Sequence, residues 1–173
     1  MHCHLSAEII VEELCAATVN VFLTMLDLHV RPEAAYIQRS PLEAQDGVEG
    51  LVGLAGNYAG IGALCCNSDL ACFLSSCFLQ MQIAAVDEMV LDTMGELTNM
   101  IIGSFKNALE KQTGPLAMSI PTVVHGKAIT TRAMKHNQWV VVPFWINGEQ
   151  LIVKVCLSAE VEASLGAQDG LAV

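Results

Sequence analysis

One stretch decides both the fold and the candidate site of this chain, and it reads Asp92-Thr93-Met94-Gly95-Glu96-Leu97-Thr98-Asn99-Met100-Ile101-Ile102-Gly103-Ser104-Phe105-Lys106-Asn107. On a helical wheel its apolar side chains form one narrow stripe, made of Met94, Leu97, Ile101, Phe105 and Ala108. Glu96, Asn99 and Gly103 lie almost opposite this stripe. The spacing therefore predicts a long amphipathic helix with a carboxylate and a carboxamide three residues apart, both pointing away from the core.

Two glycines flank Asn99 on this predicted helix. Gly95 and Gly103 lie at the i−4 and i+4 positions, one turn to either side. Each costs about 1 kcal/mol relative to alanine in a helix interior. We therefore expect that something must come close to this face of the helix.

Length and composition indicate one folded domain spanning residues 1–173, with a core over about 7–158 and a weakly ordered tail at 159–173. The 173 residues are 53% hydrophobic and 15% charged, which is far from the composition of a disordered chain. The net charge is −10, and no lysine or arginine occurs between Arg39 and Lys106. Nucleic-acid binding, which needs basic patches, is therefore not expected. A cationic or metal-bearing partner fits the charge, and so does simple solubility.

The cysteines and the N-terminal end offer only weak signals of chemistry. The seven cysteines have no regular spacing, which favours buried reduced thiols in a cytosolic protein. His2-Cys3-His4 could bind a soft metal, but a frayed chain end is the stronger interpretation. Residues 51–68 and 70–86 are uncharged but interrupted by glycines or polar residues, so we expect no membrane insertion. No basic segment precedes an apolar one, so no signal peptide is expected.

The remaining chain predicts an α+β fold with a mainly antiparallel sheet and long helices packed on one face. The helices are expected over Ala7–Leu28 (N-cap Ser6), Leu70–Gln82 (N-cap Asp69) and Asp87–Lys111. The strands are expected within Val48–Cys66 (two, with a turn near Asn57), over Met118–Thr131, and as a hairpin over Trp139–Leu157. Asn147-Gly148 predicts a type I′ turn in that hairpin, and Pro32–Gly47 predicts a loop with at most one short strand.

Several stretches taken together resemble the CheC/CheX family, phosphatases that act on chemotaxis-type response regulators. The motif Gly-Glu-x-x-Asn-x-x-x-Gly is present as Gly95-Glu96-Leu97-Thr98-Asn99-Met100-Ile101-Ile102-Gly103. Similar stretches are Val21-Phe22-Leu23-Thr24-Met25, Gly50-Leu51-Val52-Gly53-Leu54-Ala55-Gly56, Ser119-Ile120-Pro121-Thr122-Val123-Val124 and Val141-Val142-Pro143-Phe144. Glu-x-x-Asn alone occurs by chance in many helices. The ordered set, which spans most of residues 8–157, is what carries the resemblance.

The resemblance is closer to CheX than to CheC. CheC proteins usually carry one Glu-x-x-Asn site on each of two long helices. Here the first helix has Glu13 paired with Ala16, so the resemblance implies a single active centre. It also implies a cytoplasmic, homodimer-prone hydrolase in chemotaxis-type two-component signalling.

The substrate implied by the resemblance is an aspartyl phosphate on a CheY-like receiver domain. Asn99 would orient the attacking water, because a carboxamide offers an acceptor and donors at fixed geometry. Glu96 would pair with the lysine of the receiver. Gly95 and Gly103 would let the partner approach, and Asp92, Met100 and Ile102 would border the contact. No cofactor of its own is implied, and Mg²⁺ is expected in the receiver.

Two other classes of function remain open from the sequence. A non-catalytic adaptor could use the same exposed face to bind receivers or chemosensory complexes without hydrolysis. Thiol or metal chemistry could use the cysteines and the His2-Cys3-His4 end. His125 and His136 have no triad-like neighbours in the sequence, so we treat them as structural.

Overall fold

The computed structural model describes residues 5–39, 45–132 and 138–159. This part of the chain forms three helices, α1 (Ala7–Leu26), α2 (Ser68–Leu79) and α3 (Glu88–Thr113). It also forms seven strands: β1 (Tyr36–Arg39), β2 (Gln45–Gly56), β3 (Tyr58–Cys66), β4 (Leu116–Met118), β5 (Thr122–Ile129), β6 (Gln138–Ile146) and β7 (Glu149–Ala159). His2-Cys3-His4, His136 and the predicted weakly ordered tail beyond Ala159 lie outside the described residues.

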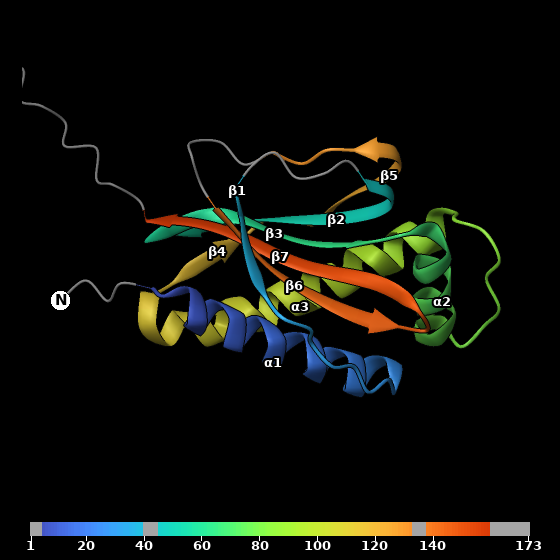
Figure 1. The fold of residues 1–173 in the computed structure, drawn as a ribbon, viewed down its shortest axis with the longest axis horizontal. Coiled ribbons are helices and arrows are strands. Elements are labelled where there is room, and N and C mark those ends of the chain that lie inside the picture. The colour runs from blue at the N-terminus through green and yellow to red at the C-terminus, as the bar shows by residue number, and fades with distance from the viewer. Residues whose placement is uncertain (1–4, 40–44, 133–137, 160–173) are drawn as a thin grey trace, which may run out of the picture.

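The strands form one antiparallel sheet in the order β1-β6-β7-β3-β2-β4, with β5 also paired to β2. The three helices lie together against one face of this sheet (Figure 1). The α+β fold with helices on one face is therefore confirmed.

Capping side chains fix where the helices begin. Ser6, the predicted N-cap of α1, accepts a hydrogen bond from the Ile9 N–H. Asp87, predicted as the first residue of α3, is its N-cap and accepts a hydrogen bond from the Val90 N–H. The predicted cap of α2 is wrong by two residues. Asn67, rather than Asp69, accepts from the Leu70 N–H, and Asp69 falls within the first turn of the helix.

The turns of the hairpins lie where their turn-forming residues predict them. Asn147 and Gly148 have φ values of 52° and 80°, as a type I′ turn between β6 and β7 requires. β2 and β3 meet at a tight turn at Asn57, as predicted. The strand predicted over Met118–Thr131 is present as β5 but starts later than predicted, at Thr122, because residues 119–121 separate it from β4, which ends at Met118.

Glycines on the sheet allow α3 to pack very close to it. A Cβ placed on Gly62 of β3 would lie 2.6 Å from Cδ1 of Ile102, and one on Gly50 of β2 would collide with Oγ1 of Thr98. Thr98 donates its hydroxyl proton to the carbonyl of Met94 within the helix, so its polar atom is satisfied in the core. The close packing holds α3 in a fixed position, and the outer side of this helix carries the candidate site.

α1 is long and apolar enough, by length and composition alone, to cross a membrane. In this fold one side of the helix packs in the core, although Leu23 and Met25 remain exposed. Leu14 and Phe22 are completely buried, and α1 packs against α3 and the sheet.

Candidate functional site

The candidate site lies on the outer side of α3. Glu96 is exposed and Asn99 is half-buried, whereas the intervening Leu97 and Thr98 are completely buried. The carboxylate and the carboxamide therefore lie on the side of the helix that faces away from the core, as their spacing predicts. Asp92, one turn before Glu96, is also exposed.

The two glycines that flank Asn99 face the protein's own chain. A Cβ on Gly95 would lie 3.2 Å from Cγ2 of Val123 and 3.8 Å from Cγ of Pro121. A Cβ on Gly103 would lie 3.4 Å from Cε of Met118. The prediction that these glycines make room for a partner is therefore corrected, since the space beside them is filled by the end of β4 and the start of β5.

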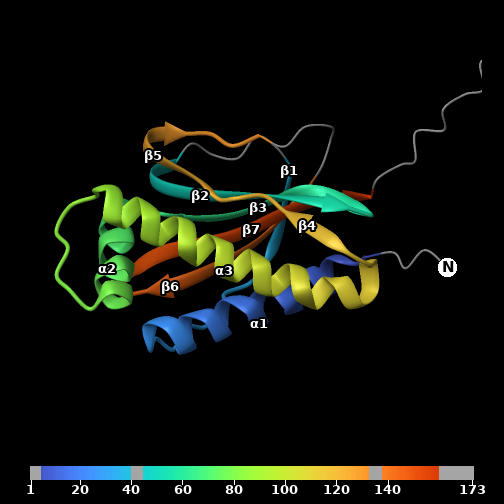
Figure 2. The ribbon, with the colours of Figure 1, turned by 180° about the vertical axis from the view of Figure 1, so that it is seen from behind.

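This arrangement gives α3 a wall along one side of the site. The chain from Met118 to Val123 runs antiparallel to α3, with its first residue beside Gly103 and its last beside Gly95. Figure 2 shows β4 and the chain leading to β5 beside α3. Asn99 lies midway between the two glycines on the helix, so the middle of this wall flanks Asn99.

Two further predicted contact residues differ in their exposure. Ile102 is completely buried and packs against Gly62. The prediction that Ile102 borders the partner contact is therefore wrong, because this residue falls on the sheet-facing side of α3. Met100 is partly buried and packs against the main core, so only part of its side chain reaches the surface.

Charge on this side of α3 is unbalanced. Glu88, Asp92 and Glu96 are exposed at successive turns of the helix. The nearest lysine on α3, Lys106, is engaged 2.9 Å from a carboxylate oxygen of Glu110. A hydrogen bond from the Leu116 N–H and the nearby Lys106 hold the pKa of Glu110 below its usual value. Within the described ranges no lysine or arginine forms an ion pair with Glu96.

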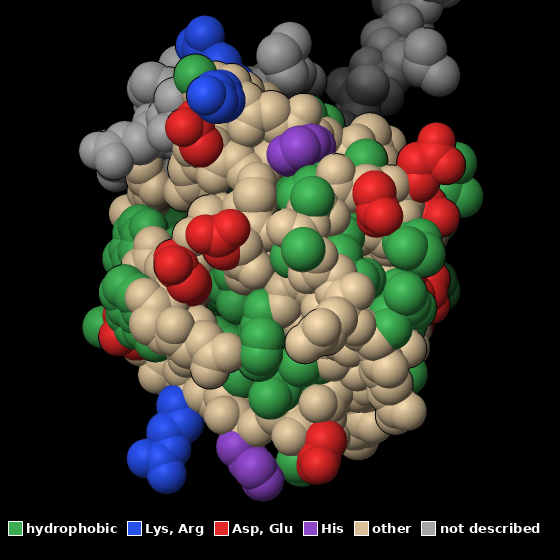
Figure 3. Space-filling model, turned by 90° about the vertical axis from the view of Figure 1, so that its right-hand side faces the viewer, with side chains coloured by type: hydrophobic (Ala, Val, Ile, Leu, Met, Phe, Trp, Pro, Cys, Tyr) green, Lys and Arg blue, Asp and Glu red, His purple; other side chains and the backbone are tan. Residues whose placement is uncertain are grey.

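Figure 3 views the α2 end of the molecule, where acidic side chains lie among hydrophobic ones and lysines and arginines lie only at the margins. The long acidic stretch without basic residues, noted in the sequence, includes α2 and most of α3. This end of the molecule is therefore suited to a basic partner surface.

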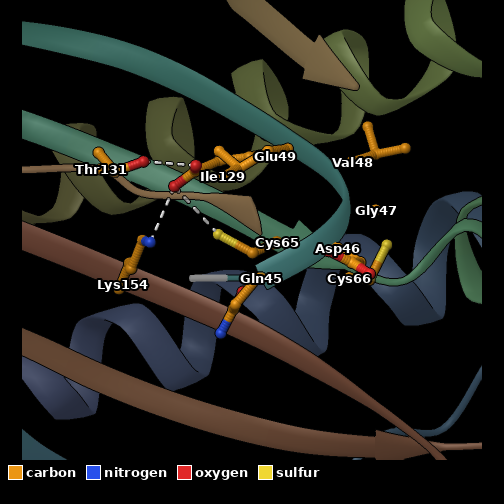
Figure 4. Close-up of a pocket in the computed structure, with 10 residues that line it drawn as sticks. All are labelled: Gln45, Asp46, Gly47, Val48, Glu49, Cys65, Cys66, Ile129, Thr131 and Lys154. Carbon is orange, nitrogen blue, oxygen red and sulfur yellow. Dashed lines mark hydrogen bonds and ion pairs between the residues drawn. The ribbon is translucent and has the colours of Figure 1, made fainter. Parts of the chain in front are cut away.

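The opposite face of the sheet holds a polar cluster that the sequence analysis missed. Glu49 on β2 and Lys154 on β7 are both buried and form an ion pair at 2.8 Å. Cys65 donates to the same carboxylate at 3.3 Å, and Thr131 donates to its other oxygen. Lys154 also lies 5.2 Å from the ring centre of Trp139. Figure 4 shows the side chains of Lys154, Cys65 and Thr131 converging on Glu49.

This cluster is a structural ion pair, because the carboxylate of Glu49 is fully occupied by its neighbours. Burial raises the pKa of Glu49, but Lys154, Thr131 and Cys65 together hold it below its usual value. The signal in the sequence was Lys154 itself, a lone charge within the apolar run of β7.

Thiol and metal chemistry find little support in the described residues. Burial raises the pKa of the Cys66 thiol to about 12 and that of Cys65 further still, so neither supplies a thiolate near neutral pH. No group of three or more His, Cys, Asp or Glu side chains in the described ranges is placed to hold a metal ion. His125 lies 3.5 Å from Oγ of Ser68 in an exposed contact, which is not the buried, oriented pair that nucleophilic catalysis requires.

Comparison with known proteins identifies the family. The model of the family described as chemotaxis phosphatase CheX matches residues 48–145, which include the whole of α3 and its exposed Glu-x-x-Asn pair. The chain belongs to the CheX family. It is therefore a chemotaxis phosphatase, a hydrolase. Among curated proteins, none matches this sequence.

Solved structures share the fold over nearly their whole length. A CheC-like protein from Shewanella sp. PV-4 is 26% identical with a TM-score of 0.79, covering 87% of this chain and 98% of its own. CheX from Vibrio vulnificus is 27% identical with a TM-score of 0.78, covering 86% and 99%. A CheX–CheY complex with beryllofluoride and magnesium from Borrelia burgdorferi is 22% identical with a TM-score of 0.74, covering 86% and 97%.

Proposed function

We propose that this CheX-family protein hydrolyses the aspartyl phosphate of a CheY-like receiver domain at the Glu96–Asn99 face of α3. The observation that carries the proposal is the placement of this pair. Both side chains reach the surface of a helix that is held rigidly against the sheet, and the backbone beside Asn99 is shielded by the protein's own chain. The Borrelia burgdorferi CheX structure, which contains CheY, beryllofluoride and magnesium, supports a receiver as the partner.

Asn99 is proposed to position the water that attacks phosphorus. An acyl phosphate is already labile, and the receiver supplies Mg²⁺ and a lysine that neutralise the phosphoryl oxygens. What remains is to hold a water in line with the leaving carboxylate, which is a matter of positioning. A carboxamide can accept a hydrogen bond from that water and donate one to a phosphoryl oxygen without acting as a base.

Glu96 is proposed to pair with the lysine of the receiver and so fix the docking register. The carboxylate is exposed and lies one helical turn from Asp92, with no basic neighbour paired to it among the described residues. The carboxylate is therefore available to form an ion pair with a lysine of the partner. Asp92 and the exposed part of Met100 are proposed to lie within or beside this contact.

The assembly and location follow from the same proposal. A receiver substrate is cytoplasmic, so we place this protein in the cytoplasm, acting as one domain and without membrane insertion. We propose that it is a homodimer and that it needs no cofactor of its own, since Mg²⁺ belongs to the receiver.

The proposal is tested by phosphate release from the host's CheY-like receiver, charged with acetyl phosphate in the presence of Mg²⁺. Wild-type protein is expected to accelerate release. Asn99→Ala should lower kcat by about 100-fold, which corresponds to about 2.7 kcal/mol of transition-state stabilisation. Glu96→Ala should mainly raise KM, because it removes a docking contact. Glu12→Ala, an exposed glutamate on α1, is the matched control and should leave both unchanged.

The second candidate, a non-catalytic adaptor, uses the same exposed face and predicts a different result. If wild-type protein binds the host's receivers but does not accelerate phosphate release from any of them, the adaptor is favoured. Retention of full activity by Asn99→Ala would contradict the proposed role of Asn99.

A further inference from the structure

Ile120 is the most exposed large hydrophobic side chain in the described part of the chain, with 85% of its surface accessible. Isolated exposed apolar residues are ordinary on protein surfaces. What distinguishes Ile120 is where it lies, because it belongs to residues 119–121, which separate β4 from β5 beside α3.

The backbone that carries Ile120 is held in place on both sides. Ser119 donates its N–H to the carbonyl of Gly53 at 2.9 Å, and its hydroxyl accepts from the Gly53 N–H at 2.9 Å. The same hydroxyl donates to the carbonyl of Ile120. On the other side, Pro121 and Val123 pack beside Gly95. Residues 119–121 therefore form a well-anchored backbone segment from which the side chain of Ile120 projects into solvent.

The antiparallel course of this segment along α3 brings Ile120 beside Asn99. Met118 lies beside Gly103, and Pro121 lies beside Gly95, one turn to either side of Asn99. Ser119 and Ile120 occupy the interval between them. A partner surface that covers Asn99 therefore meets Ile120 on the β4–β5 side of the site.

We propose that Ile120 is an apolar docking residue that contacts the receiver domain beside its phosphorylated aspartate and sets the affinity of the encounter. This inference rests on the proposed function and adds a contact to it. The receiver is the occupant because a second copy of this chain seated on Ile120 would cover Asn99 and close the site. Because the side chain is displayed on a fixed support, little entropy is lost in ordering it when the receiver binds.

The test is steady-state phosphate release from the host's CheY-like receiver, charged with acetyl phosphate and Mg²⁺, using Ile120→Ser. Burial of an isoleucine at the contact predicts a rise in KM of about 10- to 100-fold for this variant. The value of kcat should stay within about twofold, because an apolar contact made equally in the ground and transition states is uniform binding. Ile120→Leu, which keeps the apolar volume, should stay close to wild type.

The matched control is Leu23→Ser, which removes another exposed aliphatic side chain, 40% exposed, from α1. Its KM is expected to remain that of wild type. Thermal unfolding of Ile120→Ser should also match wild type, since the side chain makes little contact with the core.

The results that would contradict the role of Ile120 can be distinguished from those that would contradict the proposed function. An unchanged KM for Ile120→Ser, in an assay where Asn99→Ala abolishes turnover, would overturn this inference and leave the proposed function standing. A wild-type protein inactive on all host receivers would overturn both. If light scattering showed that Ile120→Ser converts a dimer to a monomer, Ile120 would belong to contacts between copies and the inference would be wrong.

Discussion

At the scale of single residues, the proposed chemistry depends on how Asn99 is surrounded. An asparagine on a fully open helix face would be solvated from every side and would hold a water no better than bulk solvent does. Here one side of Asn99 is walled by residues 118–123 and the other is open at Glu96. Gly95 makes this close approach possible, because a Cβ there would lie only 3.2 Å from Cγ2 of Val123, whereas a Cβ on Gly103 would just touch the end of Met118 at 3.4 Å.

The buried thiols provide a prediction at this scale. With a pKa of about 12, only about one Cys66 in ten thousand is ionised at pH 8, and Cys65 is ionised still less. Treatment of the folded protein with iodoacetamide at pH 8 should therefore leave both residues unmodified, as read by mass spectrometry of peptides. In urea both should react readily. Modification of either in the folded protein, with loss of activity before unfolding, would favour thiol chemistry over the phosphatase mechanism.

At the scale of elements, the packing of α3 on the sheet fixes the position of the site. Gly62 on β3 and Gly50 on β2 have no side chains, so the side chains of Ile102 and Thr98 pack directly against the backbone of the sheet. Alanine in a strand interior is ordinarily more stable than glycine by about 0.5–1 kcal/mol. At Gly62 the added methyl would meet three carbon atoms of Ile102 at 2.6–2.8 Å, so steric overlap should reverse that sign.

We therefore expect Gly62→Ala to lower the free energy of unfolding by about 1–3 kcal/mol, the usual cost of overpacking a core. In a protein that already carries Ile102→Ala, Gly62→Ala should cost much less stability than it costs in the wild type, because the added methyl then fills the space left by the isoleucine. Urea unfolding of the two single variants and the double variant measures this coupling. Additive effects would show that the two side chains do not meet.

The buried Glu49–Lys154 pair provides a second prediction for the sheet. Lys154→Met leaves a buried carboxylate without its cation and should cost about 3–5 kcal/mol of stability at pH 7. The double variant Glu49→Gln, Lys154→Met should lose much less, because no charge remains buried. If the single and double variants lost the same free energy of unfolding, Lys154 would not be stabilising the buried carboxylate of Glu49.

The pH dependence has a definite sign. The pKa of Glu49 is lowered in the folded state, so its contribution is fully present above its unfolded value of about 4.3 and is lost as the pH falls through the folded value. Stability measured from pH 7 down to pH 3 should therefore fall more steeply for wild type than for Glu49→Gln. Parallel curves would contradict this assignment.

Much of this architecture could be predicted from local sequence patterns. The apolar stripe, the caps Ser6 and Asp87 and the Asn147-Gly148 turn act over a few residues, so the helices α1 and α3 and the last hairpin were predictable. The exposure of Glu96 and Asn99 followed from the same periodicity. The split of β4 from β5 was not predictable, because it depends on hydrogen bonds between Ser119 and Gly53, 66 residues apart in the chain.

The same limit explains the errors around the site. The width of the buried side of α3 depends on how closely the helix meets the sheet, and this is set by Gly62 on a strand distant in sequence. Ile102 is therefore buried although it lies next to the exposed row. The sequence indicated that something approaches α3 closely at Gly95 and Gly103. It could not show that the approaching segment is residues 118–123 of the same chain.

At the scale of the whole molecule, the sheet has β1 at one edge and β4 with β5 at the other. The site lies on the β4–β5 side of α3, so the β1 edge can pair with a second copy without covering Asn99. We expect light scattering to give the mass of two chains, 37 kDa from 18.5 kDa each. A mass of one chain at micromolar concentration would contradict the proposed homodimer but not the proposed active site.

The central claim is that Asn99 acts on the chemical step after the receiver has docked. The most direct test is the rate of dephosphorylation of the acetyl-phosphate-charged receiver at saturating enzyme, comparing wild type with Asn99→Ala after both are shown to bind the beryllofluoride-loaded receiver with similar affinity. The account predicts a loss of about 100-fold in the rate with little change in binding. Equal rates for the two proteins would contradict it.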